Sequence, residues 1–389
     1  MNKTFIPMLS LLTLFFSCSE YPFSDKTETE NNYMYTISNP VWVNDSGIVC
    51  FISRNKAKEG LLLCEMDAWT GMSTELLSKP DSIYMKGNLS LSKDKRFLLF
   101  DGATYSNYFF RRQIYRFDRL TKVMTSITNE SHNENPEFSP DGSKVIFDSG
   151  YMFDDTRGVA KTHIQNADGT GRYPIDPNLN DWDRFGHFLY DGKRIVVQTS
   201  RTAMRSVDWI LGELYVMNLD GTNPIRIALG DLGSSYPYPS PINNDLLYLD
   251  LSEGAGQEMG YKIVNIDDVL KLTDIRSQFL TIPITHLTIP LNVRKLKWSP
   301  DGNRIAISGT TDTRLEKYDL YLINRDGTSF KRLTSGLNTI DFNWSVNGKY
   351  IAAADQSPKD DRLPYFHLVN ADNGSINKIY VEIPEALRN

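Results

Sequence analysis

Short runs of apolar residues alternate with polar turn residues along the chain. The clearest examples are FSPDGSKVIFDS, which starts at Phe138, and WSPDGNRIAISG, which starts at Trp298. In both, a large apolar residue precedes Ser-Pro-Asp-Gly, and a run of strand-forming residues follows. Proline sets φ for a turn, aspartate bonds its own backbone and glycine takes a positive φ. Each segment therefore predicts two strands joined by a tight turn.

The same pattern recurs with a period near 50 residues. Weaker copies start at Trp42, Leu91, Phe188, Ser240 and Trp344. A second phrase with Asp-Gly at a turn lies midway through most units, and copies of it start at Ile164, Leu214 and Leu320. Two hairpins per unit give four strands, and this period is typical of β-propellers. We expect the bulky residues that open the units to pack between neighbouring blades.

The predicted fold class is all-β: a single β-propeller of four-stranded antiparallel blades over residues 33–389. Seven starting positions favour seven blades. The fifth unit is the least regular, because residues 254–295 contain a short helical turn at residues 266–270 and prolines that interrupt strand pairing. Six blades with one embellished unit are therefore the alternative. Residues 33–38 are expected to add a strand that helps close the ring.

These phrases resemble the WD-like repeat of the TolB family, whose signature is a W-S-P-D-G hairpin followed by L-Y and D-G-T. The resemblance covers roughly residues 35–386 and implies the propeller fold. Similar repeats occur in periplasmic partner-binding proteins, in prolyl-oligopeptidase propellers and in oligogalacturonate lyases, so the resemblance leaves function open. The TolB propeller binds a peptidoglycan-associated lipoprotein. That partnership is not expected here, because the sequence lacks TolB's separate N-terminal domain.

The N-terminus predicts a lipoprotein. Residues 1–18 combine Lys3, an apolar run and Phe-Phe-Ser-Cys, which resembles a lipobox with Cys18 as the lipidated residue. An ordinary signal peptide with an incidental cysteine is the alternative. Residues 19–32 are polar and acidic and predict a flexible tether. Ser19 after the cysteine resembles outer-membrane sorting, so we expect a cell-envelope lipoprotein that faces either the periplasm or the cell surface.

Two cysteines remain, Cys50 and Cys64, on strands expected to be neighbours in the first blade. A cross-strand disulfide is one interpretation in an oxidising compartment. Two small buried apolar residues are the favoured one.

The turns inside the hairpins are short and share one face of the predicted propeller, whereas the longer connections share the opposite face. Binding residues usually lie on variable loops of a rigid scaffold. The candidate partner-binding residues on these connections are Tyr105, Tyr108, Phe109, Phe110, Arg111, Arg112, Tyr151, Phe153 and Trp209.

Crossovers between blades are expected to bring charged residues to the mouth of the channel. The binding candidates among them are His132, Glu134, Asp183, Arg184 and His187. Glu137, Asp181, Trp182, Arg294, Lys297, Asp341 and Asn343 are placed there as well.

No catalytic or metal-binding spacing stands out. There is no G-x-S-x-G elbow, and the five histidines show neither H-x-x-x-H nor H-E-x-x-H spacing. We predict no cofactor and no metal. The net charge of −6 disfavours nucleic acid as a partner.

The favoured function is therefore a non-catalytic binding module for a protein or envelope glycan, attached to the membrane only by its lipid. The alternative is a carbohydrate lyase or glycosidase, with His132, His187 and the pairs Glu134/Glu137 and Asp181/Asp183 acting at the channel mouth.

Overall fold

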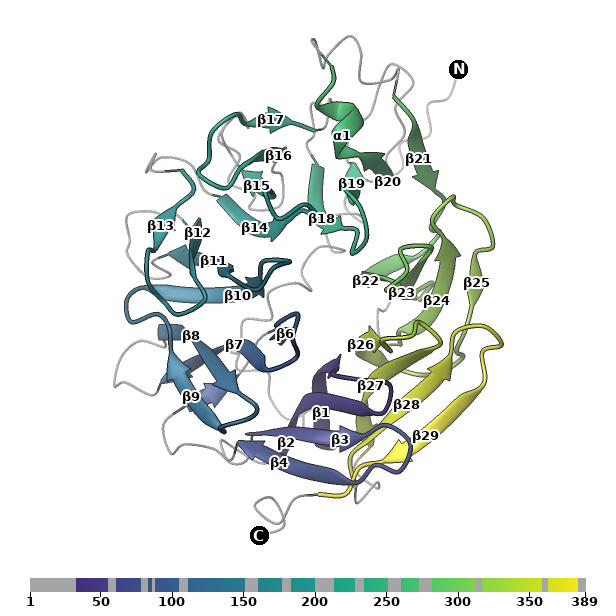
Figure 1. Cartoon of the computed structure of the whole chain (residues 1–389). Helices are drawn as coiled ribbons and strands as arrows, with labels where there is room; N and C mark the ends of the chain where they lie inside the picture. Colours follow the sequence, from purple (N-terminus) through teal and green to yellow (C-terminus); the bar gives the residue numbers. More distant parts are fainter. Residues whose placement is uncertain are drawn as a thin grey trace, which may run out of the picture.

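The strands form antiparallel sheets arranged as a ring around a central axis (Figure 1). Seven blades follow one another around this ring, and β1 joins the first and last of them into one eight-stranded sheet through its pairing with β27. The chain is a seven-bladed β-propeller. The computed structural model describes residues 33–54, 61–77, 83–85, 88–104, 111–150, 160–176, 183–199, 213–227, 234–250, 260–272, 282–312, 317–358 and 363–383.

Each of the first four blades runs from an inner strand at the axis to an outer strand at the rim. In blade 2 the inner strand is interrupted, and β5 and β6 both pair with β7. The strands are β1 (Tyr33–Trp42), β2 (Gly47–Arg54), β3 (Leu61–Asp67) and β4 (Ser73–Leu77) in blade 1; β5 (Ile83–Met85), β6 (Ser90–Leu91), β7 (Phe97–Thr104), β8 (Arg111–Asp118) and β9 (Val123–Ser126) in blade 2; β10 (His132–Phe138), β11 (Lys144–Gly150), β12 (Lys161–Asn166) and β13 (Tyr173–Pro174) in blade 3; and β14 (Asp183–Phe188), β15 (Arg194–Thr199), β16 (Glu213–Asn218) and β17 (Ile225–Arg226) in blade 4.

The last three blades repeat this plan, which confirms seven blades rather than six. The strands are β18 (Ser234–Pro239), β19 (Asp245–Asp250), β20 (Gly260–Asn265) and β21 (Ile284–Leu287) in blade 5; β22 (Asn292–Trp298), β23 (Arg304–Thr310), β24 (Asp319–Asn324) and β25 (Lys331–Arg332) in blade 6; and β26 (Thr339–Trp344), β27 (Tyr350–Pro358), β28 (Tyr365–Asn370) and β29 (Ile376–Tyr380) in blade 7. The helical turn expected in the fifth unit is α1 (Ile266–Val269), between β20 and β21.

The Ser-Pro-Asp-Gly hairpins form as their residue types predict. Asp141 accepts hydrogen bonds from the hydroxyl of Ser139 at 2.6 Å and from the backbone N–H of Ser143 at 3.0 Å. Gly142 and Gly302 have φ values of 76° and 66°, which are accessible to glycine at little cost. Each hairpin thus satisfies its own polar groups and leaves the strands free to pair.

The Asp-Gly-Thr turns have a second role, because their glycines contact the preceding blade. Gly221 has a φ of 79°, and a Cβ on it would lie 1.9 Å from the carbonyl oxygen of Ile175 in blade 3. In the corresponding turn of blade 1, which reads Trp-Thr-Gly, a Cβ on Gly71 would lie 1.9 Å from the carbonyl oxygen of Tyr380 in blade 7. The motif therefore selects glycine both for its backbone conformation and for close packing of neighbouring blades.

The bulky residues that open the units pack between blades, as expected. Trp42, Phe138, Phe188, Trp298 and Trp344 are all buried. The indole N–H of Trp298 donates to the backbone carbonyl of Tyr238 in the preceding blade at 2.9 Å, and that of Trp344 donates to the carbonyl of Lys297 at 3.1 Å. These side chains fix both the spacing and the register of adjacent sheets.

The first strand closes the ring. β1 pairs with β2 and also with β27 of the last blade, through Tyr33 opposite Pro358 and Thr36 opposite Gln356. This confirms the closing role expected for residues 33–38. The seam between blades 1 and 7 is tied again near its rim, where the N–H of Glu382 donates to the carbonyl of Gly71 at 2.9 Å.

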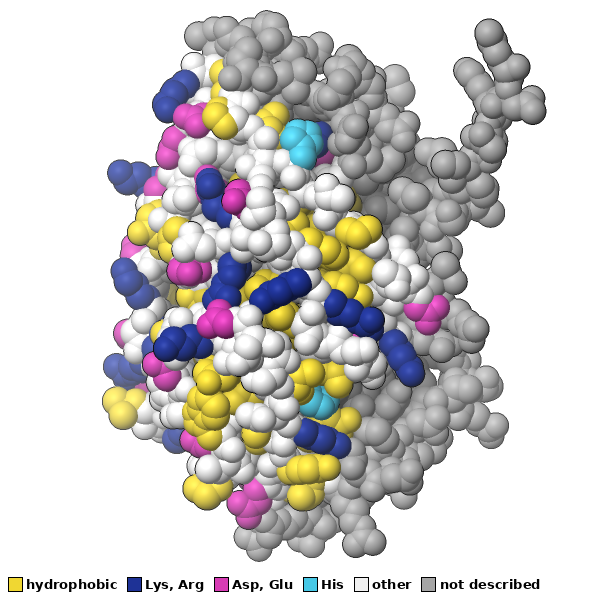
Figure 2. Space-filling model, turned by 90° about the vertical axis from the view of Figure 1, so that its right-hand side faces the viewer, with side chains coloured by type: hydrophobic (Ala, Val, Ile, Leu, Met, Phe, Trp, Pro, Cys, Tyr) yellow, Lys and Arg dark blue, Asp and Glu magenta, His cyan; other side chains and the backbone are white. Residues whose placement is uncertain are grey.

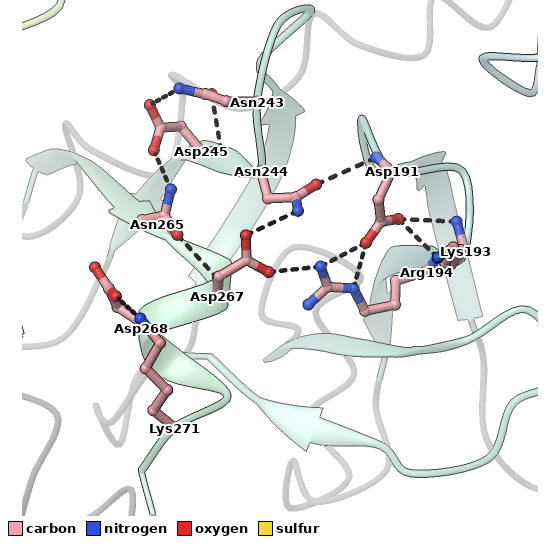
Figure 3. A network of polar contacts seen from close by, with 10 residues as sticks. All are labelled: Asp191, Lys193, Arg194, Asn243, Asn244, Asp245, Asn265, Asp267, Asp268 and Lys271. Carbon is pink, nitrogen blue, oxygen red and sulfur yellow. Dashed lines mark hydrogen bonds and ion pairs between the residues drawn. The ribbon is translucent and has the colours of Figure 1, made fainter.

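A polar network ties blade 4 to blade 5 on the face of the tight turns (Figure 3). The guanidinium of Arg194 binds Asp191 in its own blade and reaches Asp267 of α1 at 2.7 Å. Asn244 donates to Asp267 at 3.0 Å and accepts from the N–H of Asp191 at 3.2 Å. Here α1 and the segment after it replace the short hairpin that other blades carry, so the fifth blade is the exception to the rule of short turns.

The two cysteines are buried and free, which confirms the favoured interpretation. Cys50 lies opposite Cys64 on β2 and β3, the neighbouring strands expected. Burial raises the pKa of the Cys64 thiol to about 12, with a further contribution from Glu75. Both thiols are therefore neutral parts of the core.

The outer edge of the ring is mixed in charge. Figure 2 views the side that carries β21, β25, β28 and β29, where Lys, Arg, Asp and Glu side chains are interspersed with apolar ones. Over the residues that the structure describes, no helix is long and apolar enough to cross a membrane.

Candidate functional site

The inner strands carry the charged side chains that the sequence placed in crossovers. His132, Glu134 and Glu137 lie on β10, and Asp183, Arg184 and His187 lie on β14. Likewise, Arg294 and Lys297 lie on β22, and Asp341 and Asn343 lie on β26. The expectation of crossover positions is wrong for all of these residues, because each inner strand begins several residues earlier than the turn motif indicates. The strands begin on the face that receives the longer connections, so the first residues of each strand lie at that face.

Glu134 is the centre of a cluster to which three consecutive blades contribute. Its carboxylate is bound by the guanidinium of Arg184 from blade 4 and lies 3.4 Å from Nη1 of Arg112 in blade 2. Nε2 of His132 lies 3.4 Å from the same carboxylate. We call Arg112, His132, Glu134 and Arg184 the Glu134 cluster. Its four members come from three consecutive blades, with His132 and Glu134 both on β10, so the packing of neighbouring blades brings them together.

The surroundings of Glu134 keep it ionised. Burial opposes its charge, but the hydrogen bond from His132 and the positive charges of Arg184 and Arg112 outweigh that effect and lower its pKa to about 2. At neutral pH this side chain is a fixed anion between two guanidinium groups, and it holds no proton to transfer.

Asp101 lies behind the cluster and is fully buried. Its Oδ2 is 3.2 Å from Nη1 of Arg112, and it accepts a hydrogen bond from the backbone N–H of Asn135 in the next blade. Burial raises the pKa of this carboxyl to about 7, although the nearby Arg112 lowers it. Asp101 therefore titrates near neutral pH and holds Arg112 in place from the inner side.

Asp148 repeats this arrangement one blade later. It is buried and accepts from the side-chain amide of Asn135 at 3.2 Å, the backbone N–H of Phe185 at 3.2 Å and the hydroxyl of Thr162 at 3.1 Å. Burial raises the pKa of Asp148, against the effect of Arg184.

The residues that these carboxylates bind sit in irregular stretches of the inner strands. Asn135 and Phe185 have φ values of 56° and 53°, which are strained for residues other than glycine, especially for an aromatic one. Strand register shifts at both places, next to Glu134 and Arg184. The buried carboxylates therefore stabilise the two bulges that aim the side chains of the Glu134 cluster.

The remaining described candidates form separate contacts. Nδ1 of His187 is 2.6 Å from Oε2 of Glu137. Burial lowers the pKa of His187, but the charge and hydrogen bond of Glu137 outweigh burial, so the pKa is raised overall. Asp183 is buried and lies 3.5 Å from Nζ of Lys161. His132 and His187 thus bind different carboxylates and do not share one site.

Several predicted residues lie outside the described part of the chain, and their roles stay predictions. These are Cys18, Tyr105, Tyr108, Phe109, Phe110, Tyr151, Phe153, Asp181, Trp182 and Trp209, together with the side chain of Arg111. Residues 1–18 and 19–32 lie outside it too.

The sequence interpretation missed Asp101 and Asp148. The signal for them is weak but present, because both close an apolar run in the second strand of a unit, in FLLFD and VIFD. A carboxylate in a strand that is otherwise buried requires a partner. A carboxylate at the same position of two consecutive repeats indicates that both have the same kind of partner.

The described histidine and carboxylate side chains do not gather into a metal site. Within the described ranges, no three His, Cys, Asp or Glu side chains are arranged to hold a metal ion.

Comparison with known proteins identifies the fold. No protein-family pattern matches the chain, and no curated protein matches it in sequence. Among solved structures, an oligogalacturonate lyase in complex with manganese is similar at a TM-score of 0.58 and 14% identity, over 88% of this chain and 89% of that one. One from a study of two prolyl endopeptidases is similar at 0.61 and 11% identity, over 91% and 49%. TolB from Acinetobacter baumannii is similar at 0.47 and 16% identity, over 72% and 62%.

These likenesses are distant, and the chain spans less than two thirds of the TolB chain and about half of the endopeptidase chain. The two likenesses with TM-scores of 0.58 and 0.61 show a shared propeller fold, and at these low identities they show nothing about activity. The neighbours also differ in kind, so the function has to be argued from this protein's own residues.

Proposed function

We propose that this protein is a lipid-anchored envelope propeller that binds a protein partner or an envelope-associated ligand without converting it. The binding surface in this proposal is the face of the longer connections at blades 2, 3 and 4. The observation that carries it is the meeting of Arg112, Glu134 and Arg184 from three blades at that end of the inner strands. A site assembled from separate repeats has little reason to exist for the stability of any one blade.

The chemistry of the cluster favours recognition over proton transfer. Glu134 is held ionised, whereas a general acid or base works best with a pKa near the working pH. The side chains of Arg112 and Arg184 keep 21% and 22% of their surface exposed, so their outer edges can still contact a ligand. Arginine with aromatic residues is typical of the strong contacts in protein interfaces. Residues 105–110 follow β7 directly and supply four aromatic side chains in the sequence.

The location in this proposal rests on the first 32 residues. Lipidation of Cys18 would fix the chain to a membrane, and residues 19–32 would span the gap to blade 1. The binding surface would then face either the periplasm or the medium outside the cell.

Site-specific photo-cross-linking in the intact envelope of the producing cells tests the proposal. A photoreactive phenylalanine analogue at Phe109 samples the proposed surface, and one at Leu120, which is 76% exposed in a tight turn, samples the opposite face. We expect a discrete adduct from position 109 that position 120 does not give and that Arg184→Ala weakens. Identical adducts from both positions, or none from position 109, would reject the proposed surface.

A carbohydrate-active enzyme is the second candidate, and Asp101 is the observation that favours it. Its pKa of about 7 and its contact with Arg112 suit a group that exchanges protons near neutral pH. Incubation with acidic and neutral polysaccharides, followed by detection of reducing or unsaturated ends, tests this role. Turnover that Asp101→Asn abolishes would favour the enzyme, and the cross-linking experiment would then report substrate rather than a partner.

A further inference from the structure

One residue of each inner strand forms a layer around the axis. In blades 1–4, 6 and 7 the residue before the opening position is half-buried, and in blade 5 Tyr238 takes this place, because it pairs with Leu247 as Glu137 pairs with Ile146. The five aromatic opening residues themselves are buried. Successive strand residues point to opposite faces of a sheet, so the residue before the opening one faces the following blade beside the axis. Ser90 thus accepts from the N–H of Phe138 in blade 3, and Glu137 from the N–H of Phe188 in blade 4. The layer consists of Val41, Ser90, Glu137, His187, Tyr238, Lys297 and Asn343.

The layer carries three ionisable side chains apart from Tyr238, and two of them satisfy each other. Glu137 binds Nδ1 of His187 through one oxygen and accepts from the backbone N–H of Phe188 at 3.2 Å through the other. Lys297 is different. Among the described residues its ammonium has neither a hydrogen bond nor an ion pair.

Asp341, the carboxylate that acts electrostatically on Lys297, is already occupied. Asp341 binds Nζ of Lys295 at 2.5 Å and accepts backbone hydrogen bonds from Asn39 at 2.9 Å and Phe342 at 2.8 Å. Asp341 is therefore committed to Lys295, and the amine of Lys297 has no carboxylate bound to it among the described residues. Burial, followed by the repulsion of Lys295, lowers the pKa of Lys297 to about 7, although Asp341 raises it.

A partly desolvated amine beside a second cation is stabilised most by an added anion, because charge-assisted hydrogen bonds are strong where water is scarce. We propose that Lys297 is the receptor for an anionic group, a carboxylate or a phosphate, on a ligand that enters along the axis of the propeller. The site lies on blades 6 and 7, across the axis from the Glu134 cluster on blades 2 to 4 (Figure 1). It is therefore independent of the proposed partner surface.

Competitive labelling of the full-length protein provides the first test. An amine-acylating reagent at pH 7, read by peptide mass spectrometry, should modify Lys297 at least about tenfold faster than the exposed turn residue Lys349, because more of its amine is neutral. Acetate or inorganic phosphate at 50 mM should protect Lys297 and leave Lys349 unprotected. Equal labelling of the two lysines, or no protection by either anion, would overturn the proposal.

Calorimetric titration with the same two anions gives an independent test. In two buffers that differ in ionisation enthalpy, binding at pH 7 should take up roughly half a proton, since the amine is half protonated before the anion arrives. Lys297→Met should abolish this uptake, and Lys349→Met should preserve it. An unchanged uptake in a Lys297→Met protein with a normal melting temperature would reject the site. A response to acetate alone indicates a carboxylate ligand, and a response to phosphate alone indicates a phosphorylated one.

Discussion

The two ends of the blades follow different rules. At the end of the tight turns, contacts repeat from blade to blade, and glycines such as Gly169, Gly221 and Gly327 each approach a backbone carbonyl of the preceding blade. At the end of the longer connections, one position differs in chemistry between repeats. It is Asp101 in blade 2, Asp148 in blade 3, Gln198 in blade 4 and Ser308 in blade 6.

This difference separates the residues that build the ring from those that specialise it. A contact that every blade needs is preserved in the repeat, and it makes the repeat visible in the sequence. A buried carboxylate that occupies this position in only two blades cannot be needed for the repeat as such. Asp101 and Asp148 instead shape the inner strands locally and thereby place Arg112, Glu134 and Arg184.

Gly221→Ala should break the repeated end most severely. The new methyl group would meet the carbonyl oxygen of Ile175, and the residue would keep a left-handed conformation. We expect a loss of about 3–5 kcal/mol in the free energy of unfolding, measured by urea denaturation. Gly142→Ala is the matched control, because it has a similar φ but open space around it, and should cost about 1 kcal/mol. Equal losses would show that blade contact does not select this glycine.

Asp148→Ala should damage the specialised end almost as much. It removes the acceptor for the N–H of Phe185, the amide of Asn135 and the hydroxyl of Thr162. We expect a loss of about 2–3 kcal/mol in urea denaturation. The turn variant Asp141→Ala, which loses bonds that water can replace, should cost about 1 kcal/mol. A larger loss of unfolding free energy in Asp141→Ala than in Asp148→Ala would show that the turn carboxylate stabilises the fold more than the buried one.

The pH dependence of stability should carry the signature of Asp101. Its folded pKa of about 7 lies above the unfolded value, so the folded state binds more protons and stability falls as pH rises through the window between them. Between pH 5.5 and 7 the expected loss is about 1.5 kcal/mol. Denaturation at both pH values should show a loss that is smaller by about 1.5 kcal/mol in Asp101→Asn than in the wild type, because the raised pKa values of Asp148 and His187 still contribute in the variant. An unchanged loss in that variant would assign the titration to another group.

Replacing Phe109 and Phe110 together by alanine should have the smallest effect on stability. If both aromatic residues lie on the binding surface, the free energy of unfolding should change by less than about 0.5 kcal/mol. Capture of the cross-linked partner should nevertheless fall strongly. Severe destabilisation would show instead that these residues belong to the core.

The features that recur in every unit could be predicted from the sequence. The hairpins, the seven blades, the closing strand before Ser38 and the packing of Trp298 between blades all follow from local turn chemistry and a regular period. Each of these depends on residues whose conformational preference and position along the chain agree.

The sequence did not predict the bulges at Asn135 and Phe185, because a positive φ opposes the local preference of both residues. Neighbouring blades impose these conformations through Asp101 and Asp148, and such contacts between blades are visible only in the folded structure. The same reason hid the Glu134 cluster. Its residues were proposed one by one, but nothing along the chain showed that Arg112 and Arg184 meet at one carboxylate.

Because β1 closes the ring, one step of folding has to come late. The N–H of Asn39 bonds to Asp341, which is 302 residues away, and β1 completes its pairing only with β27. During synthesis part of the edge of β1 therefore stays unpaired until the seventh blade has been made. Non-local pairing of this kind folds slowly and exposes a strand edge to other chains. A factor that shields this edge during synthesis or export should raise the yield of closed propeller more than one that acts on the middle blades.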